Sequence, residues 1–334
     1  MSDPSRLLRP FDDGDLAVPA GPVVWLRAEA SGFLDLFDPG QLTAEQSFRP
    51  AHDRLSMRGI APVAEATGRY SMAVASITRD RVESRGLIAR AWALAEPSAK
   101  VIINGDKTEG IDALIREIKA HLAFDGVTAK SHGKIAWLTR TEATPALFDT
   151  WAEAARPRQN SAGYLTGPGM FSADGPDAGS ERLAAHFGPK IKGRAADFGA
   201  GWGWLSAALL KASPEIAAID LYEAERAALT AAEANITDPR ASFIWADIPQ
   251  TPVRDPYDLI IMNPPFHAGR RADPGLGISF VAAAQRFLKP NGQLLMVANR
   301  HLPYEPALEA GFRRVEKRAE DAQFKIYLAA KPRR

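Results

Sequence analysis

The stretch GRAADFGAGWGWLSAALLKASP, residues 193–214, restricts the possible folds most strongly, because an apolar strand pattern passes through a glycine loop into a helical pattern. Gly199, Gly201 and Gly203 occupy alternate positions of this loop. Glycine allows the backbone to adopt positive φ and to approach a ligand closely. The dinucleotide-binding fingerprint is Gly-x-Gly-x-x-Gly, whereas this loop has the spacing Gly-x-Gly-x-Gly. The loop therefore predicts an α/β fold with a ligand-binding turn of a different kind.

Strand-like and helical segments alternate along both halves of the chain. After the glycine loop, strand-like runs end near Asp220, Asp247 and Asn263, which predicts a doubly wound, mostly parallel sheet. The runs YSMAVASI, AKVIINGDK and GKIAWLTR alternate with helical segments in the first half and predict another α/β module. Residues 151–168 are rich in Pro, Gly, Ser and Asn. We therefore expect domains at residues 1–150 and 169–334, joined by a linker at residues 151–168.

The composition excludes several classes of function. The 334 residues contain no cysteine, and the six histidines show no metal-ligand spacing, so disulfides, thiolate nucleophiles and a metal site are not expected. With 41 basic and 40 acidic residues, a nucleic-acid partner would need a local basic patch. No apolar run reaches the ~18 residues of a membrane span. The sequence predicts a cytoplasmic protein.

Asp220 is the first candidate ligand outside the loop. It follows Gly199 by about 20 residues, the spacing at which an acid accepts hydrogen bonds from ribose hydroxyls. The same residue also precedes a helical segment, so a helix-capping role is the alternative.

The sequence Asn263-Pro264-Pro265-Phe266 predicts a stiff corner at the end of a buried strand. Proline cannot donate a hydrogen bond and holds the preceding residue extended. The Asn263 side-chain oxygen and the Pro264 carbonyl can therefore each accept one hydrogen of an –NH₂ group. Such a grip would align a weakly nucleophilic aryl amine for attack, and Phe266 would stack on its base. A simple tight turn is the alternative.

These motifs resemble known enzymes. The glycine loop preceded by Asp197 resembles the first motif of class I methyltransferases, and Asn-Pro-Pro-Phe is typical of those that modify amino nitrogens. The strings GMFSADGPDAGSERLAAHF, NPPFHAG, VANRHLPYEPAL and FKIYLA resemble the ribosomal RNA guanine-N2 methyltransferases that have a duplicated methyltransferase fold. The resemblance covers residues from about 165 to 330. One departure is Ala200, where that family often has cysteine.

The resemblance implies two tandem Rossmann-like modules, of which the first is degenerate and binds no cofactor. It implies S-adenosylmethionine as the cofactor and ribosomal RNA, or a ribosomal subunit assembly intermediate, as the substrate. The residues that it places at the cofactor are Asp197, Gly199, Ala200, Gly201, Asp220, Asp247, Asn263, Phe171 and Ser180, with Asp177 and Gly179 beside them. Asp247 would meet the adenine amino group, although a turn-forming role suits it equally well.

Contacts to RNA are expected around the corner. His267, Arg270 and Arg271 follow it directly and could hold a flipped base or its phosphates. Residues 270–334 contain 13 Lys and Arg but 6 Asp and Glu, which fits either an RNA surface or an ordinary solvated face. We expect a monomer.

Two other functions remain compatible with these patterns. One is a protein glutamine-N5 methyltransferase, which would use the same corner without a phosphate-binding surface. The other is a non-catalytic RNA-binding or assembly factor on a methyltransferase-like fold. For residues 1–150 we expect recruitment of RNA or a structural role.

Overall fold

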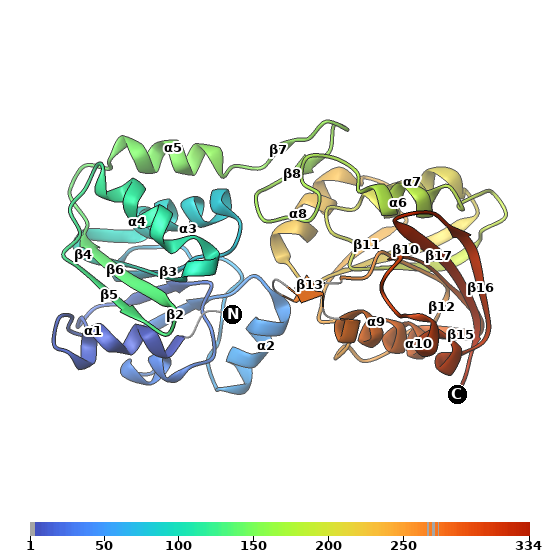
Figure 1. Cartoon of the computed structure of the whole chain (residues 1–334), viewed down its shortest axis with the longest axis horizontal. Coiled ribbons are helices and arrows are strands. Elements are labelled where there is room, and N and C mark those ends of the chain that lie inside the picture. The colour runs from blue at the N-terminus through green and yellow to red at the C-terminus, as the bar shows by residue number, and fades with distance from the viewer. Residues whose placement is uncertain (1–3, 266, 269–270, 273) are drawn as a thin grey trace. The chain divides into compact units, whose positions relative to one another are not determined.

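The computed structural model describes residues 4–265, 267–268, 271–272 and 274–334, except for the side chains of residues 4, 5, 267, 268, 271, 272 and 274. The chain divides into two compact units. The first contains Met1–Pro157 and Gly167–Gly169, and the second contains Arg158–Thr166 and Met170–Arg334. Figure 1 shows the first unit in blue to green and the second in yellow-green to red.

The first unit contains a six-stranded sheet in the order β2-β1-β3-β4-β6-β5. The strands are β1 Val23–Leu26, β2 Leu42–Glu45, β3 Tyr70–Ser76, β4 Ala95–Asp106, β5 Gly126–Lys130 and β6 Gly133–Thr139. β1 to β4 pair in parallel, and β6 joins β4 and β5 antiparallel. The α-helices are α1 Arg9–Asp12, α2 Arg49–Met57, α3 Arg81–Leu94, α4 Ile111–Lys119 and α5 Ala146–Ala154, with short 3-10 helices at Pro4–Leu8, Gly32–Leu36 and Lys107–Glu109.

Alternate side chains of these strands form separate cores on the two faces of the sheet, as the period of a strand requires. On β1, Val24 and Leu26 join a cluster with Trp92 of α3 and Trp151 of α5. Trp25, between them, packs on the opposite face. Both faces are therefore covered, which explains why the strands are almost wholly apolar.

The second unit contains a seven-stranded sheet in the order β11-β10-β9-β12-β15-β17-β16. The strands are β9 Gly193–Phe198, β10 Ile216–Glu223, β11 Ala241–Trp245, β12 Tyr257–Met262, β15 Leu288–Asn299, β16 Phe312–Glu320 and β17 Phe324–Pro332. The strands from β9 to β12 and β15 pair in parallel, and β17 joins β15 and β16 antiparallel. The helices are α6 Ala178–Ala184, α7 Trp204–Ala212, α8 Arg226–Asn235, α9 Pro274–Phe287 and α10 Glu305–Gly311. Two small hairpins are β7 Arg158–Gln159 with β8 Leu165–Thr166, and β13 His267–Ala268 with β14 Arg271–Ala272.

The helices of this unit cover opposite faces of the sheet. Leu183 of α6 and Leu209 of α7 pack in one core cluster. Phe280 and Phe287 of α9 pack in the other, together with Leu308 of α10. In Figure 1, α6, α7 and α8 accordingly lie on one side of the sheet and α9 and α10 on the other.

The two sheets share a connection pattern. In each unit the first strand lies in the interior of the sheet, and the second strand pairs with one of its sides. The chain then crosses over and adds further strands on the opposite side of the first strand. An antiparallel pair of strands forms the edge on that side. The first sheet lacks a counterpart of β11. The predicted fold class, two mostly parallel α/β modules with the first one reduced, is therefore confirmed. Residues 151–168, the predicted linker, contain the end of α5 and the hairpin β7–β8.

Candidate active site

The glycine loop and the Asn-Pro corner lie next to each other at the carboxyl edge of the second sheet. The loop follows β9 and Asn263 follows β12, and these two strands pair in parallel with Ile261 opposite Asp197. A Cβ placed on Gly199 would lie 3.9 Å from Cδ of Pro265. The chain order reverses between β9 and β12. Open α/β sheets bind their ligands at such a reversal.

The backbone of the loop takes a shape that depends on its glycines. Gly199, Gly201 and Gly203 have φ of 76°, 55° and 90°. A Cβ on Gly203 would approach Cδ1 of Ile236 to 2.8 Å, whereas one on Gly201 would meet nothing within 4 Å. Gly201 therefore presents bare backbone to open space. The side chain of Ala200 is buried in the core, so this residue can offer a ligand only its backbone.

The acid at the end of β10 is Glu223, and the prediction that Asp220 ends this strand is wrong. Asp220 lies three residues inside β10, and its carboxylate accepts hydrogen bonds from Arg194 Nη2 at 2.7 Å and Tyr257 Oη at 2.6 Å. Arg194 belongs to the start of β9, so Asp220 faces the edge away from the glycine loop. Both contacts satisfy a nearly buried charge.

Glu223 stands where Asp220 was expected. Its Oε2 accepts a hydrogen bond from the Gly201 amide at 2.8 Å, and its Oε1 accepts from the amides of Ala224 and Glu225. Burial raises the pKa of this carboxyl above its usual value. The sequence contained a signal for this residue, since the β-prone pair Leu221-Tyr222 continues the strand beyond Asp220.

Asp197 lies beneath the loop with only 1% of its surface exposed. Its Oδ2 accepts a hydrogen bond from Ser206 Oγ on α7 at 2.7 Å. Burial raises the pKa of this carboxyl to about 7, and the nearby Glu223 adds to the effect. The structure thus places Asp197 behind the loop.

The side-chain amide of Asn263 has a fixed orientation. Its Nδ2 donates to Oδ2 of Asp177 at 2.9 Å and to Oγ of Ser180 at 3.0 Å. Asp177 also caps α6 by accepting from the Ser180 amide. An ionised carboxylate accepts hydrogen bonds and cannot donate them. Asn263 must therefore direct its amide nitrogen, Nδ2, toward Asp177. The amide oxygen then remains as the acceptor for an outside amine. Sequence reasoning missed this role of Asp177.

The other predicted residues lie around this centre. Phe171 is 57% exposed, and its carbonyl accepts from the indole nitrogen of Trp202 in the glycine loop at 3.0 Å. Asp247 lies two residues beyond β11, and its carbonyl accepts from Gln250 and Thr251, as in a turn.

Four of the predicted site residues lie wholly or partly outside the described residues. Phe266 and Arg270 lie outside the described residues. His267 and Arg271 are described only as backbone, in the hairpin β13–β14.

Comparison with known proteins agrees with this geometry. The Methyltransferase small domain family matches residues 162–328. A "Ribosomal RNA small subunit methyltransferase C" of Hahella chejuensis is 34% identical over 236 residues, which cover 68% of either protein. The enzyme of the same name from Shewanella loihica is 30% identical over 238 residues, 69% of this chain and 68% of that protein. The chain belongs to the ribosomal RNA small subunit methyltransferase C family.

A solved structure shares the fold of this family member over nearly its whole length. It is the T. thermophilus 16S rRNA N2 methyltransferase in complex with AdoMet and guanosine, with a TM-score of 0.79 and 23% identity over 98% of this chain and 92% of that one. The predicted family and the predicted class of enzyme, a methyltransferase, are thereby confirmed.

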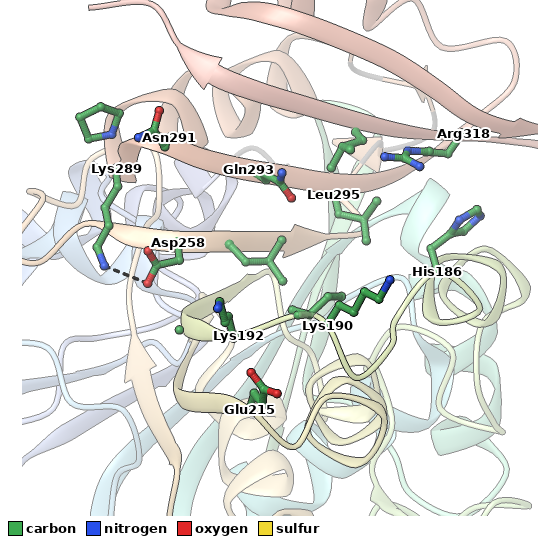
Figure 2. Close-up of a pocket in the computed structure, with 15 residues that line it drawn as sticks. His186, Lys190, Lys192, Glu215, Asp258, Lys289, Asn291, Gln293, Leu295 and Arg318 are labelled. Atoms are coloured by element: carbon green, nitrogen blue, oxygen red, sulfur yellow. Dashed lines mark hydrogen bonds and ion pairs between the residues drawn. The ribbon is translucent and has the colours of Figure 1, made fainter.

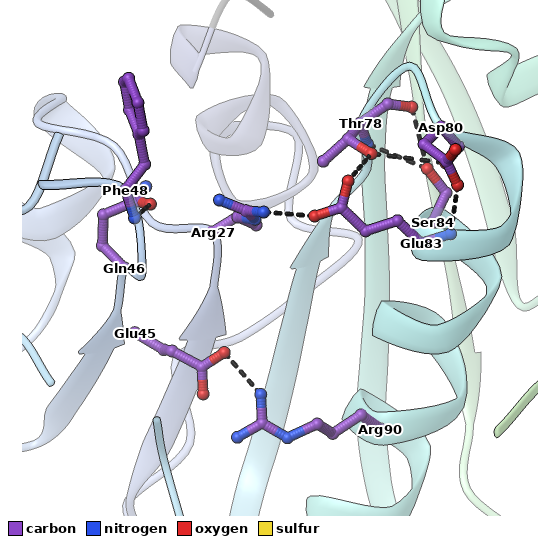
Figure 3. Close-up of polar contacts among 9 residues, drawn as sticks. All are labelled: Arg27, Glu45, Gln46, Phe48, Thr78, Asp80, Glu83, Ser84 and Arg90. Atoms are coloured by element: carbon purple, nitrogen blue, oxygen red, sulfur yellow. Dashed lines mark hydrogen bonds and ion pairs between the residues drawn. The ribbon is translucent and has the colours of Figure 1, made fainter. Parts of the chain in front are cut away.

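In the first unit of this methyltransferase C homologue, the carboxyl edge of the sheet corresponds to the edge that carries the candidate active site in the second unit. Its residues are different (Figure 3). Arg27 follows β1, where β9 has its glycine loop, and has φ of 56°. It forms an ion pair with Glu83. Glu45, which ends β2 as Glu223 ends β10, pairs with Arg90 at 2.5 Å and accepts from the Ala66 amide.

This edge therefore does not fit a nucleoside cofactor. A long cationic side chain stands where a ligand would need bare glycine backbone, and the strand-end acid is already neutralised. Among the described residues, no group of three or more His, Cys, Asp or Glu side chains is placed to hold a metal ion. None of the described helices has the length and apolar character needed to cross a membrane.

Proposed function

We propose that this protein transfers a methyl group from S-adenosylmethionine to the exocyclic N2 amine of a guanine in small-subunit ribosomal RNA. The observation that carries the proposal is the fixed Asn263 amide beside an open glycine loop. The family supports ribosomal RNA as the substrate. Guanine N2 is supported by the structural relative from T. thermophilus, a 16S rRNA N2 methyltransferase solved with AdoMet and guanosine.

The residues at the loop fit the cofactor. Gly201 offers a positive-φ turn with open space beside it, and Glu223 ends the neighbouring strand next to that turn. Carboxylates at this position accept hydrogen bonds from ribose hydroxyls. Phe171 lies at the surface close to Trp202 of the same loop. When bound, the cofactor supplies an electrophilic methyl group on a sulfonium.

Asn263 and Pro264 act on the target amine. The Asn263 oxygen and the Pro264 carbonyl each accept one amine hydrogen, which favours a pyramidal nitrogen and directs its lone pair. Asp177 and Ser180 keep the amide from rotating, because rotation would bring the Asn263 oxygen against the Asp177 carboxylate. This arrangement needs no strong base, since alignment and preorganised dipoles lower the barrier.

The test is methyl transfer by the Asn263→Ala variant. Small-subunit RNA, free and partly assembled, is incubated with labelled S-adenosylmethionine and digested to nucleosides. The wild type should yield N2-methylguanosine, and the variant should be about 10²–10³-fold slower, the usual cost of a lost transition-state contact. Cofactor affinity, measured by calorimetry, should stay near the wild-type value. Undiminished turnover in the variant would refute the amine-holding role.

The same assay separates the two alternatives. Methylation of a protein glutamine with no nucleoside product would indicate a glutamine-N5 methyltransferase. Failure of the wild type to bind S-adenosylmethionine would indicate a non-catalytic factor. The open glycine loop and the family membership both favour the enzyme that acts on RNA.

A further inference from the structure

A groove with a volume of about 1120 Å³ lies at the amino edge of the second sheet (Figure 2). It is lined by the segment around Lys190 and Lys192, by Asp258 at the start of β12, and by residues of β15, β16 and β17. Asp258 and Asn263 lie at opposite ends of β12. Five residues of extended chain separate them, or roughly 16 Å. The groove is therefore separate from the candidate active site.

The rim of the groove is basic. Four cationic side chains line it, Lys190, Lys192, Lys289 and Arg318, against two acids, Glu215 and Asp258. Two of these cations are already paired, Lys289 with Asp258 at 2.8 Å and Arg318 with Glu316 at 3.0 Å. Lys190 and Lys192 are exposed and form no ion pair with any described residue.

The floor of the groove is apolar. Leu259, Leu295 and Leu328 of three adjacent strands lie beneath the cations and belong to one core cluster. The exposed amides of Asn291 and Gln293 also line the groove. Figure 2 shows Lys289 and Arg318 at opposite ends of the groove, with Lys190 and Lys192 between them. Spread cations suit a chain of phosphates, and amides above an apolar floor suit the edges and faces of bases.

We propose that this groove is a second RNA-binding site, which holds a strand of the substrate remote from the methylated nucleotide. Lys190 and Lys192 bind its phosphates. The inference rests on the proposed function for the identity of the polymer. At about 3.4 Å per phosphate, on the order of five nucleotides of helical strand cover the distance from the corner to the groove. Contacts at both edges would let the enzyme recognise RNA shape in addition to the target base.

The experiment uses the full-length protein with Lys190→Gln and Lys192→Gln combined. RNA affinity is measured between low and physiological salt with the same small-subunit RNA. Affinity for RNA falls as salt rises, and the steepness of this fall reports the number of phosphate contacts. Loss of two contacts to a single strand should reduce the magnitude of the slope of log affinity against log salt by about 1.4. The KM for RNA should rise, while S-adenosylmethionine affinity and the melting temperature stay unchanged.

The matched control combines Lys211→Gln and Arg313→Gln, which remove equal charge from exposed positions of the same unit outside the groove. It should retain the wild-type slope. An equal loss in the control, or a wild-type slope in the groove variant, would overturn the proposal. So would a groove variant that loses affinity for guanosine monophosphate but keeps its affinity for RNA. A wild type that binds RNA through the groove but methylates no nucleoside would instead refute the proposed function alone.

Discussion

Replacement of Asp197 by Asn tests whether burial beneath the glycine loop keeps a proton on this carboxyl. Burial raises the pKa of Asp197 from 3.8 to about 7 in the folded protein. Between these two pH values the folded chain keeps a proton that the unfolded chain has released. Unfolding then releases a proton, so a rise in pH favours unfolding. The stabilisation is complete below pH 4 and is lost as the pH rises through 7.

The size of the effect follows from the shift. Between the two pKa values, each unit by which the pH falls below 7 raises the free energy of unfolding by about 1.36 kcal/mol. Between pH 5 and pH 8 the wild type should therefore lose roughly 3 kcal/mol that the Asp197→Asn variant does not lose. The variant keeps a hydrogen-bonding partner for Ser206, since an amide oxygen can accept from the hydroxyl.

The assay is urea denaturation of the full chain at pH 5, 6, 7 and 8. Taking the difference between wild type and variant removes the titration of the groups that do not interact with Asp197. Asp238→Asn is the matched control, because hydrogen bonds from Arg240 lower the pKa of Asp238 to about 2 and it stays ionised throughout this range. Its difference curve should be flat. Parallel stability curves for wild type and Asp197→Asn would refute the reasoning.

Three further variants test the assignment of site residues. Glu223→Gln should weaken S-adenosylmethionine binding about tenfold by calorimetry, the usual cost of losing charge in a hydrogen bond. Asp220→Asn should lower the melting temperature without a selective loss of cofactor affinity, and the reverse pattern would restore Asp220 as the ribose acid. Ser180→Ala removes one of two acceptors for the Asn263 amide, a contact worth about 1 kcal/mol, so kcat should fall roughly fivefold with cofactor affinity unchanged. An unaltered kcat would argue against an orienting role for Ser180.

The local sequence determined the architecture and the two central motifs. Alternating strand and helix patterns, the glycines at 199, 201 and 203, and the Asn-Pro-Pro corner all depend on residues that are neighbours in the chain. Their conformational preferences act within a few positions, so they can be interpreted without the fold. The parallel order of β9 and β12 then brings the loop and the corner to one edge.

Only the tertiary structure decided which side chains complete the site. Asp177 orients Asn263 across 86 positions of the chain, and the groove gathers residues from Lys190 to Leu328. The β-prone pair Leu221-Tyr222 continues β10 past Asp220, but only the paired sheet shows that Glu223 is the acid at its end. Burial and Glu223 from another strand raise the pKa of Asp197, and the hydrogen bond from Ser206 of α7 opposes the rise. Such properties arise from packing between distant segments, and no local pattern encodes them.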